Sequence, residues 1–457
     1  MRKILLSLTG FLVLSGQPLA SYGQDLLETY AQALAADPTL ANAKATQMAN
    51  REQLPQAVSQ LLPNVTATGN FTNEQYPPSI YLDSNPIQPS YYYLLNLQQN
   101  LINLAAWYGV KQAKDVAKQA DATYMASEQD LMQRVSQAYF NVLSAQDTLA
   151  FIRAQKEAVG RQLDQTQQQF EVGLVAITDV SEAQASYDST VADEIEAVNQ
   201  LSNQREALRQ ITGIWPEYLS PLKGEIPLVN PVPATDQEWV DTALEYNPTL
   251  KASNYNMEAT AQAANVARAN YAPTVTLASN YGYERLGTFA TAQSPLDETW
   301  MVGVNVNLSI YQGGYTSSQV RQNQYLFQAA KDTLEKTRRE VLSNTRNAFR
   351  AVQTSVSEVN ALNQSVVSGV KALESTQAAY DVGTRTSVDL LNSISTLYQR
   401  KQNYSQSRYT YLVSQLQLKQ AVGTLNYNDL AVINSLLSTK KPTDNSTDNL
   451  LTEEPIE

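Results

Sequence analysis

The chain has 457 residues, 43% of them hydrophobic, which is enough to bury a large core or to fill two or three domains. It contains no Cys and no His, which excludes disulfides, thiolate nucleophiles, zinc sites built on Cys or His, and His-based acid–base catalysis. The 32 Lys and Arg against 44 Asp and Glu give a net charge of −12, which argues against a nucleic-acid partner because phosphate binding needs clustered positive charge. We expect no cofactor and no metal site.

Residues 1–23 are predicted to be a signal peptide. Arg2 and Lys3 form a short basic region, residues 4–14 are apolar, and Ala20 or Gly23 ends a suitable cleavage site. No later run of about 20 apolar residues exists, so we expect any membrane contact to be made by strands or by the protein surface.

The rest of the sequence repeats itself at a constant offset of 210 positions. The matching pairs include ALAADPTL at 33–40 with ALEYNPTL at 243–250, PNVTATGNF at 63–71 with PTVTLASNY at 273–281, and FEVGLVAITD at 170–179 with YDVGTRTSVD at 380–389. We therefore predict two structural copies, 24–213 and 236–423, joined by a proline-rich connector over 214–235. The remainder, 424–457, ends in a polar, acidic tail that we expect to be disordered.

Each copy is predicted to begin with helices. Asp37-Pro38 and Asn247-Pro248 are typical of an N-cap followed by proline at the first helical position. In the first copy the helical pattern extends over about 26–60.

Alternating apolar residues then predict two strands per copy. They cover 65–71 and 93–101 in the first copy and 275–283 and 302–310 in the second. Four strands of about ten residues suit an outer-membrane barrel, but such barrels begin at eight strands, and an open sheet in lipid would leave its edges unpaired.

We therefore expect the barrel to be shared, with eight strands in a dimer or twelve in a trimer. A soluble domain whose four strands pair within one chain is the alternative on strand pattern alone. Tyrosines at the strand ends favour a membrane-interface girdle; they are Tyr76, Tyr81, Tyr91, Tyr92 and Tyr93.

The next helices are predicted to be far longer than globular ones, over about 103–170 and 312–380. Roughly 68 residues at 1.5 Å per residue make about 100 Å of helix. Residues at 4-3-4-3 spacing predict coiled-coil packing, in the same register in both copies; they are Leu131, Val135, Ala138, Val142, Ala145, Leu149 and Ile152, then Val341, Thr345, Ala348, Val352, Ser355, Val359, Leu362, Val366, Gly369 and Leu373. An elongated coiled-coil scaffold without a pore would show the same periodicity. The shorter helices, about 26–60 and 179–211, would cover one long helix if stacked end to end.

The related segments at 170–179 and 380–389 are predicted to be the turns of two helical hairpins. Gly173 and Gly383 would end the long helices in the left-handed conformation, and Asp179 and Asp389 would begin the next ones. Taken singly, Thr178-Asp179 and Ser387-Val388-Asp389 are explained equally well as N-caps and first-turn acids.

With these motifs the chain resembles the TolC-type outer-membrane efflux and secretion ducts. The resemblance covers nearly the whole mature chain and rests on the repeat, the NPxL-type helix starts, IYQGG at 310–314, and above all EVGLVAITDV and YDVGTRTSVDLL. It implies a mixed α/β membrane protein with a two-fold internal repeat. Three chains would share a twelve-strand β-barrel in the outer membrane of a Gram-negative bacterium and a long coiled-coil α-helical barrel crossing the periplasm, with an equatorial belt formed by the connector and the C-terminal segment.

The same resemblance implies a function. The trimer would be the exit duct of tripartite efflux pumps or of type I protein secretion, and it would catalyse no reaction. Its partners would be a periplasmic adaptor protein and an inner-membrane pump or ABC transporter. The inner-membrane partner would determine which cargo is exported.

It also implies a gate at the periplasmic end. Arg385 would reach Thr178 and Asp179 of a neighbouring hairpin, and Tyr380 would bond Asp179. Asp389 matches one of two acidic rings of the family's pore constriction, whereas Asn392 stands at the other, so we expect weak block by divalent cations.

Overall fold

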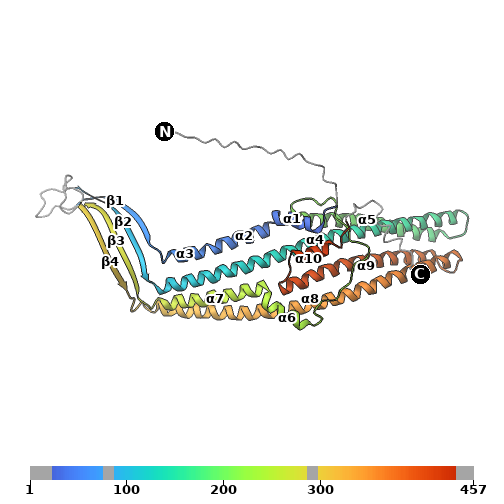
Figure 1. Ribbon diagram of the computed structural model, residues 1–457. Coiled ribbons are helices and arrows are strands. Elements are labelled where there is room, and N and C mark those ends of the chain that lie inside the picture. Colours follow the sequence, from blue (N-terminus) through green and yellow to red (C-terminus); the bar gives the residue numbers. More distant parts are fainter. Residues whose placement is uncertain (1–22, 76–86, 286–296, 439–457) are drawn as a thin grey trace.

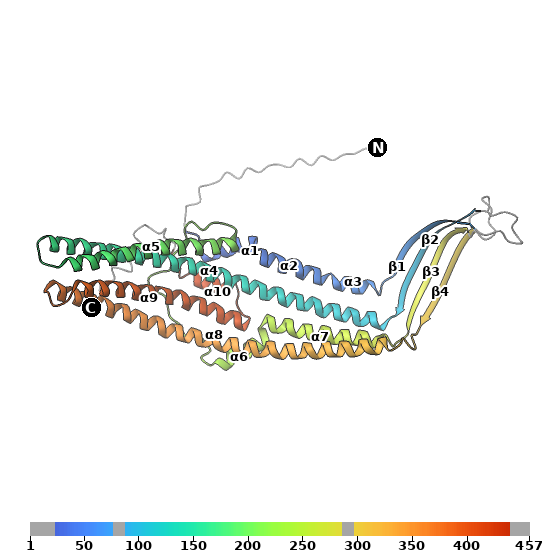
Figure 2. The same cartoon turned by 180° about the vertical axis from the view of Figure 1, so that it is seen from behind.

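The computed structural model describes residues 23–75, 87–285 and 297–438, which form an elongated molecule (Figures 1 and 2). A four-stranded sheet lies at one end, and long helices run from it to two hairpin turns at the other. The predicted signal peptide up to residue 22, Tyr76, Tyr81 and the acidic tail from residue 439 lie outside the described residues.

Two similar series of elements follow each other in the chain. They are α1 (Leu26–Ala36), α2 (Pro38–Arg51), α3 (Gln53–Ser59), β1 (Asn64–Gln75), β2 (Ile87–Ile102), α4 (Leu104–Glu171) and α5 (Ile177–Thr212), then α6 (Asp236–Tyr246), α7 (Pro248–Ala269), β3 (Thr274–Arg285), β4 (Asp297–Asn307), α8 (Tyr315–Asp381), α9 (Ser387–Val422) and α10 (Tyr427–Asn434). None of these helices is both long and apolar enough to cross a membrane.

The four predicted strands form one antiparallel sheet in the order β1-β2-β3-β4, so β2 and β3 join the two series. The fourth strand was expected to reach Ile310 but ends at Asn307, and α8 begins at Tyr315 instead of residue 312. Gly313 and Gly314 intervene with φ of +61° and +86°, a conformation that neither a strand nor a right-handed helix can contain.

Strand pairing gives this sheet one apolar and one polar face. Val65 pairs with Leu97, Leu97 with Ser279, and Ser279 with Val302, so these positions share a face. The same face carries exposed large apolar side chains, namely Val65, Phe71, Tyr93, Leu95, Tyr281, Tyr283, Trp300, Val302, Val304 and Val306. The opposite face carries mainly Thr, Asn and Gln, including Thr66, Thr68, Asn96, Gln98, Thr276, Asn280 and Asn305. Within the described residues the apolar face is uncovered.

The two long helices are present as predicted, with 68 residues in α4 and 67 in α8. The predicted seam is confirmed over most of its length, because its residues from Leu131 to Leu149 and from Val341 to Val359 are buried, apart from the half-buried Ala348. Towards the hairpin turns Gly369 is buried, but Ile152, Leu362, Val366 and Leu373 are only half-buried. Helix α4 packs against α5, α7 and α9, and α8 packs against α7 and α9.

The helical pattern predicted over about 26–60 forms three helices, and the helix start predicted at Asp37-Pro38 is confirmed. The pattern is divided at Asp37 and at Glu52 into α1, α2 and α3. Proline accounts for both breaks, because Pro38 and Pro55 lack the N–H that an uninterrupted helix needs. The predicted caps are confirmed: the side chains of Asp37 and Asn247 accept the N–H of Leu40 and Leu250 at 2.8 and 3.0 Å.

Near the middle of the long axis, three segments distant in sequence meet. Gln24 pairs with Leu219, and Leu222 pairs with Leu437. The hydroxyl of the fully buried Tyr139 on α4 lies 3.1 and 2.9 Å from the carbonyls of Gln24 and Ser220. The segment at Gln24, the connector and the C-terminal segment therefore contact one another and the long helix α4 at the same height along the molecule.

Candidate functional site

The turn of the first hairpin has the expected left-handed glycine. Gly173 has φ +76°, and its N–H and that of Leu174 donate to the carbonyls of Phe170 and Gln169 at 2.9 and 2.8 Å, which ends α4. Helix α5 begins after Ala176, whose N–H donates to the Asp179 carboxylate at 3.1 Å.

The second turn repeats this backbone and adds a side-chain cap. Gly383 also has φ +76°. Thr386 is the N-cap of α9: its hydroxyl accepts the N–H of Asp389 at 3.2 Å, and its own N–H donates to the Asp389 carboxylate at 3.1 Å. The predicted start of both helices at Asp179 and Asp389 is therefore wrong by two residues, because each carboxylate reaches back to the cap from the third helical position.

The predicted latch residues lie at this end of the molecule, and in the single chain two of them contact other groups, so the latch between neighbouring hairpins stays a prediction. The Tyr380 hydroxyl donates to Gln169 of α4 at 2.9 Å, and not to Asp179. The Arg385 guanidinium lies 3.6 Å from Asp389 of its own hairpin, and 59% of its side chain is exposed. Thr178 is exposed. Gln169 was not predicted as a site residue. It accepts the Tyr380 hydroxyl only because the two hairpins lie side by side, which the sequence pattern does not specify.

A small apolar cluster holds the two hairpins together just above the turns. It joins Val159 and Leu163 of α4, Ala183 of α5, and Leu390, Leu391 and Ile394 of α9. The partly buried Tyr380 packs against it. The hairpins of one chain therefore form a unit on their facing sides.

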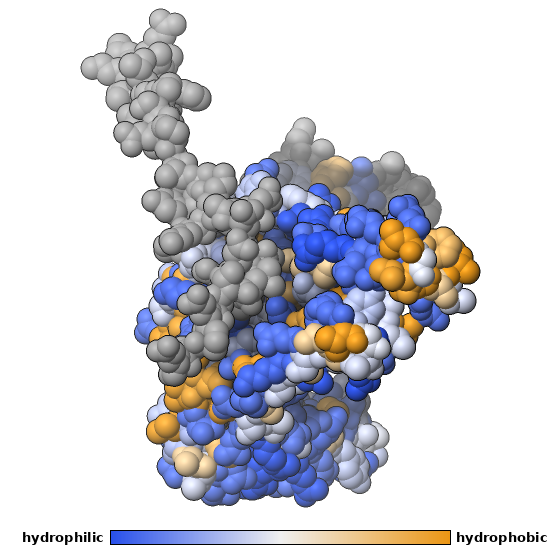
Figure 3. All heavy atoms as spheres, turned by 90° about the vertical axis from the view of Figure 1, so that its right-hand side faces the viewer, coloured by the Kyte–Doolittle hydropathy of each residue, from blue (hydrophilic) through white to orange (hydrophobic). Residues whose placement is uncertain are grey.

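Seen along the long axis, this end is largely hydrophilic with apolar patches (Figure 3). The exposed apolar side chains of the first turn are Phe170, Val172, Leu174 and Ile177, and those of the second are Val382 and Val388. The first turn thus presents more apolar surface, and the second presents the cation Arg385.

Acidic residues are distributed unequally over the two hairpins. Hydrogen bonds from the backbone and the hydroxyl of Thr386, with a smaller contribution from Arg385, hold the pKa of the Asp389 carboxyl below its usual range. Asn392, one helical turn on, is exposed, and the equivalent position of the first copy is the exposed Glu182, which the sequence reasoning overlooked. Within the described ranges there is no group of three or more acidic residues placed to hold a metal ion.

Comparison with known proteins decides what this arrangement is. A family model described as "Outer membrane efflux protein" matches residues 29–214 and again 239–424. The chain belongs to the outer membrane efflux protein family. It is 37% identical over 468 residues to "Outer membrane protein TolC" of Escherichia coli K12, covering 100% of this chain and 93% of that protein. It is 28% identical to "Alkaline protease secretion protein AprF" of Pseudomonas aeruginosa, covering 95% and 91%.

Solved structures of outer-membrane proteins share the fold. The outer membrane channel CmeC of Campylobacter jejuni matches with a TM-score of 0.77 at 18% identity, covering 95% of this chain and 97% of that one. VceC of Vibrio cholerae matches with a TM-score of 0.76 at 20% identity, covering 87% and 96%. The protein is an outer-membrane exit duct of a Gram-negative bacterium. A periplasmic scaffold without a pore, the alternative left by the periodicity, is not favoured.

Proposed function

We propose that three copies of this chain form one duct, with a twelve-strand β-barrel in the outer membrane and an α-helical barrel reaching through the periplasm. The observation that carries the proposal is the sheet, which has one uncovered apolar face, one polar face, and two edge strands, β1 and β4. In lipid the apolar face would point outward, the polar face would line the pore, and pairing of β1 with β4 of the next copy would satisfy both edges.

The proposed domain organisation follows the repeat. After a signal peptide over 1–23, the copies 24–213 and 236–423 each supply two strands and one helical hairpin. The connector 214–235 and the segment from 424 form an equatorial belt, consistent with the contacts among Gln24, Leu219, Leu222 and Leu437.

The proposed gate closes the periplasmic end between neighbouring chains. Among the described residues, the exposed Arg385 guanidinium has one long ion-pair contact, with Asp389, so it is available to reach Thr178 and Asp179 of the next hairpin. Tyr380 would exchange Gln169 for Asp179 in the same closure. Asp389 would ring the pore, with Asn392 contributing no second charge. Gly173 and Gly383 keep both turns tight enough to bring these side chains together.

We further propose that the duct works with a periplasmic adaptor and an inner-membrane pump or ABC transporter, and that it catalyses no reaction. The relatives point to both cargo classes, since their names include the "Proteases secretion protein PrtF" of Dickeya chrysanthemi and the "Outer membrane efflux protein BepC" of Brucella suis. The inner-membrane partner would select between them.

The test is assembly in the outer membrane. The wild type should need detergent for extraction and run as a heat-modifiable trimer. Val304→Lys, which places a charge on the apolar face, should abolish trimer recovery, because a lysine facing lipid costs about 2–4 kcal/mol per chain. Asn305→Lys, the neighbouring position on the polar face, is the matched control and should assemble. A soluble monomer for the wild type, or equal behaviour of both variants, would contradict the proposal.

A further inference from the structure

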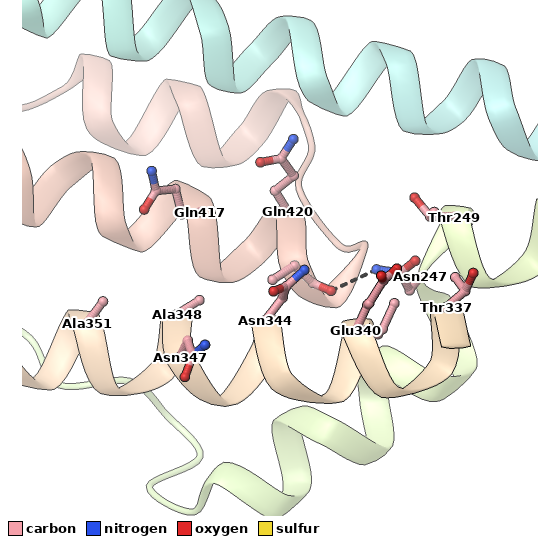
Figure 4. A pocket seen from close by; sticks show the side chains of 12 residues that line it. Asn247, Thr249, Thr337, Glu340, Asn344, Asn347, Ala348, Ala351, Gln417 and Gln420 are labelled. Carbon is pink, nitrogen blue, oxygen red and sulfur yellow. Dashed lines mark hydrogen bonds between the residues drawn. The ribbon is translucent and has the colours of Figure 1, made fainter. Parts of the chain in front are cut away.

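A hollow of about 510 Å³ opens between α8, α9 and the start of α7 (Figure 4). Its lining is rich in amides and contains one carboxylate, Glu340. The side chains of Asn344, Asn347, Gln417 and Gln420 make no hydrogen bond to any other described group of the protein. They are therefore free to bind a ligand.

The first copy shows what occupies the equivalent place. Arg134 on α4 donates to both carboxylate oxygens of Asp37 at 3.2 and 2.9 Å and to Asp130 at 2.6 Å. Asp37 is almost fully buried, with 3% of its side chain exposed. A guanidinium held by two carboxylates thus closes the junction between α2 and α4.

The second copy keeps one of the two carboxylates of this site, as Glu340, and has lost both the other carboxylate and the cation. At the 210-residue offset, Asn344 replaces Arg134, Asn247 replaces Asp37, and Glu340 replaces Asp130. Asn247 partly compensates by donating to the Ala421 carbonyl at 2.8 Å. No Lys or Arg lines the hollow, and the nearest pairing of Glu340 in the described part of the chain is a 3.8 Å contact with Lys336, where both side chains are largely exposed.

We propose that this hollow receives the guanidinium of an arginine side chain carried by a basic periplasmic partner protein. Glu340 would pair with the cation and the surrounding amide oxygens would accept its N–H groups, as Asp37 and Asp130 do for Arg134 in the first copy. The net charge of −12 favours a separate basic partner over a further copy of this chain. The existence of such a partner rests on the proposed function, but the site and its test do not involve the gate or the barrel.

The chain lacks cysteine, so a single Asn347→Cys thiol reports on the hollow without background. In the intact detergent-solubilised protein, argininamide at roughly 20 mM should slow N-ethylmaleimide labelling of this thiol at least about threefold, as expected for millimolar binding. Citrullinamide, which has the same length and the same α-amino group but an uncharged ureido group in place of the guanidinium, should leave the labelling rate unchanged. Gln137→Cys, the equivalent position beside Arg134, should not respond to argininamide.

Two second-site variants sharpen the test. Glu340→Gln should abolish protection by argininamide, and Asn344→Arg should slow labelling in the absence of ligand because its own guanidinium fills the hollow. The proposal is overturned by absence of protection, by equal protection from citrullinamide, or by protection that persists in Glu340→Gln. Labelling that appears only after the trimer is dissociated would assign the hollow to a neighbouring copy and would also overturn it. The trimer assay of the barrel variants is unaffected by any of these results.

Discussion

The two copies of the repeat build nearly the same backbone but stabilise it with different chemistry. The first copy closes its helix junction with the Arg134–Asp37 ion pair and leaves α5 without a side-chain cap at Ala176. The second uses the amide of Asn247 at the junction and caps α9 with Thr386. The shared apolar seam therefore sets the common register of the two copies, and their polar positions differ around it.

The largest expected effect concerns the glycines that end α5 and α9. Gly213 and Gly423 both have positive φ, +74° and +84°. A Cβ at Gly423 would lie 2.6 Å from the Cα of Asn247, whereas one at Gly213 would lie 3.5 Å from the Cβ of Ala36. We expect Gly423→Ala to lower the free energy of unfolding by about 4 kcal/mol and Gly213→Ala by about 1.5 kcal/mol, because only the former adds a backbone clash to the conformational strain. Denaturant unfolding of both variants measures this, and equal costs would mean that the two helix ends pack alike.

The ion pair of the first copy should contribute more to the free energy of unfolding than the equivalent amide of the second copy. Arg134→Met leaves the buried Asp37 carboxylate without its cation, and we expect a loss of about 3 kcal/mol in unfolding free energy. Asn344→Met, the equivalent change in the second copy, should cost less than about 0.5 kcal/mol. Thermal unfolding of the two variants side by side is the measurement, and a similar loss in both would show that the junctions are equivalent after all.

A buried carboxyl couples the two copies and should make their packing pH-dependent. Asp147 of α4 accepts the hydroxyls of Ser405 and Tyr409 of α9 at 2.5 and 2.8 Å. Burial raises the pKa of Asp147 above its usual range despite these bonds and the nearby Arg408. The folded state thus holds a proton that the unfolded state releases, so stability from this group is present below the unfolded pKa and is lost as the pH rises through the folded pKa.

Asp147→Asn keeps an acceptor oxygen for both hydroxyls and removes the titration. Its stability relative to wild type should therefore increase from pH 4 to pH 7, as measured by thermal unfolding across that range. A constant difference between variant and wild type would show that Asp147 does not titrate in this window.

The smallest effect is expected on cation block of the channel, at the position where the second copy has an amide instead of a carboxylate. Asn392 takes the place that Glu182 occupies in the first copy. If Asn392 faces the pore beside Asp389, Asn392→Asp should strengthen block of the channel current by Mg²⁺, by an amount set by one added charge per chain. Strong block in the wild type, or no change in the variant, would place position 392 outside the constriction.

Periodicity predicted most of the fold, including the four strands, both long helices and both glycine turns. It failed where a local feature overrode the pattern, as at Pro55, which divides the first short helix, and at Gly313 and Gly314, which delay α8. The partners of the site residues were not predictable, because the bond from Tyr380 to Gln169 depends on how the two hairpins lie side by side. The hollow beside Glu340 was not predictable for the same reason, because the residues that line it come from three helices.

In the proposed closed duct, Tyr380 and Arg385 hold the hairpins of neighbouring chains together. Single-channel conductance in planar bilayers tests this latch directly. We predict low conductance for the wild type and a several-fold rise for Tyr380→Phe combined with Arg385→Ser, because both donors of the latch are removed. The equivalent double change in the first copy, Phe170→Leu with Val175→Ser, should leave the conductance low. An unchanged conductance in the Tyr380 and Arg385 variant would show that these two side chains do not hold the duct shut.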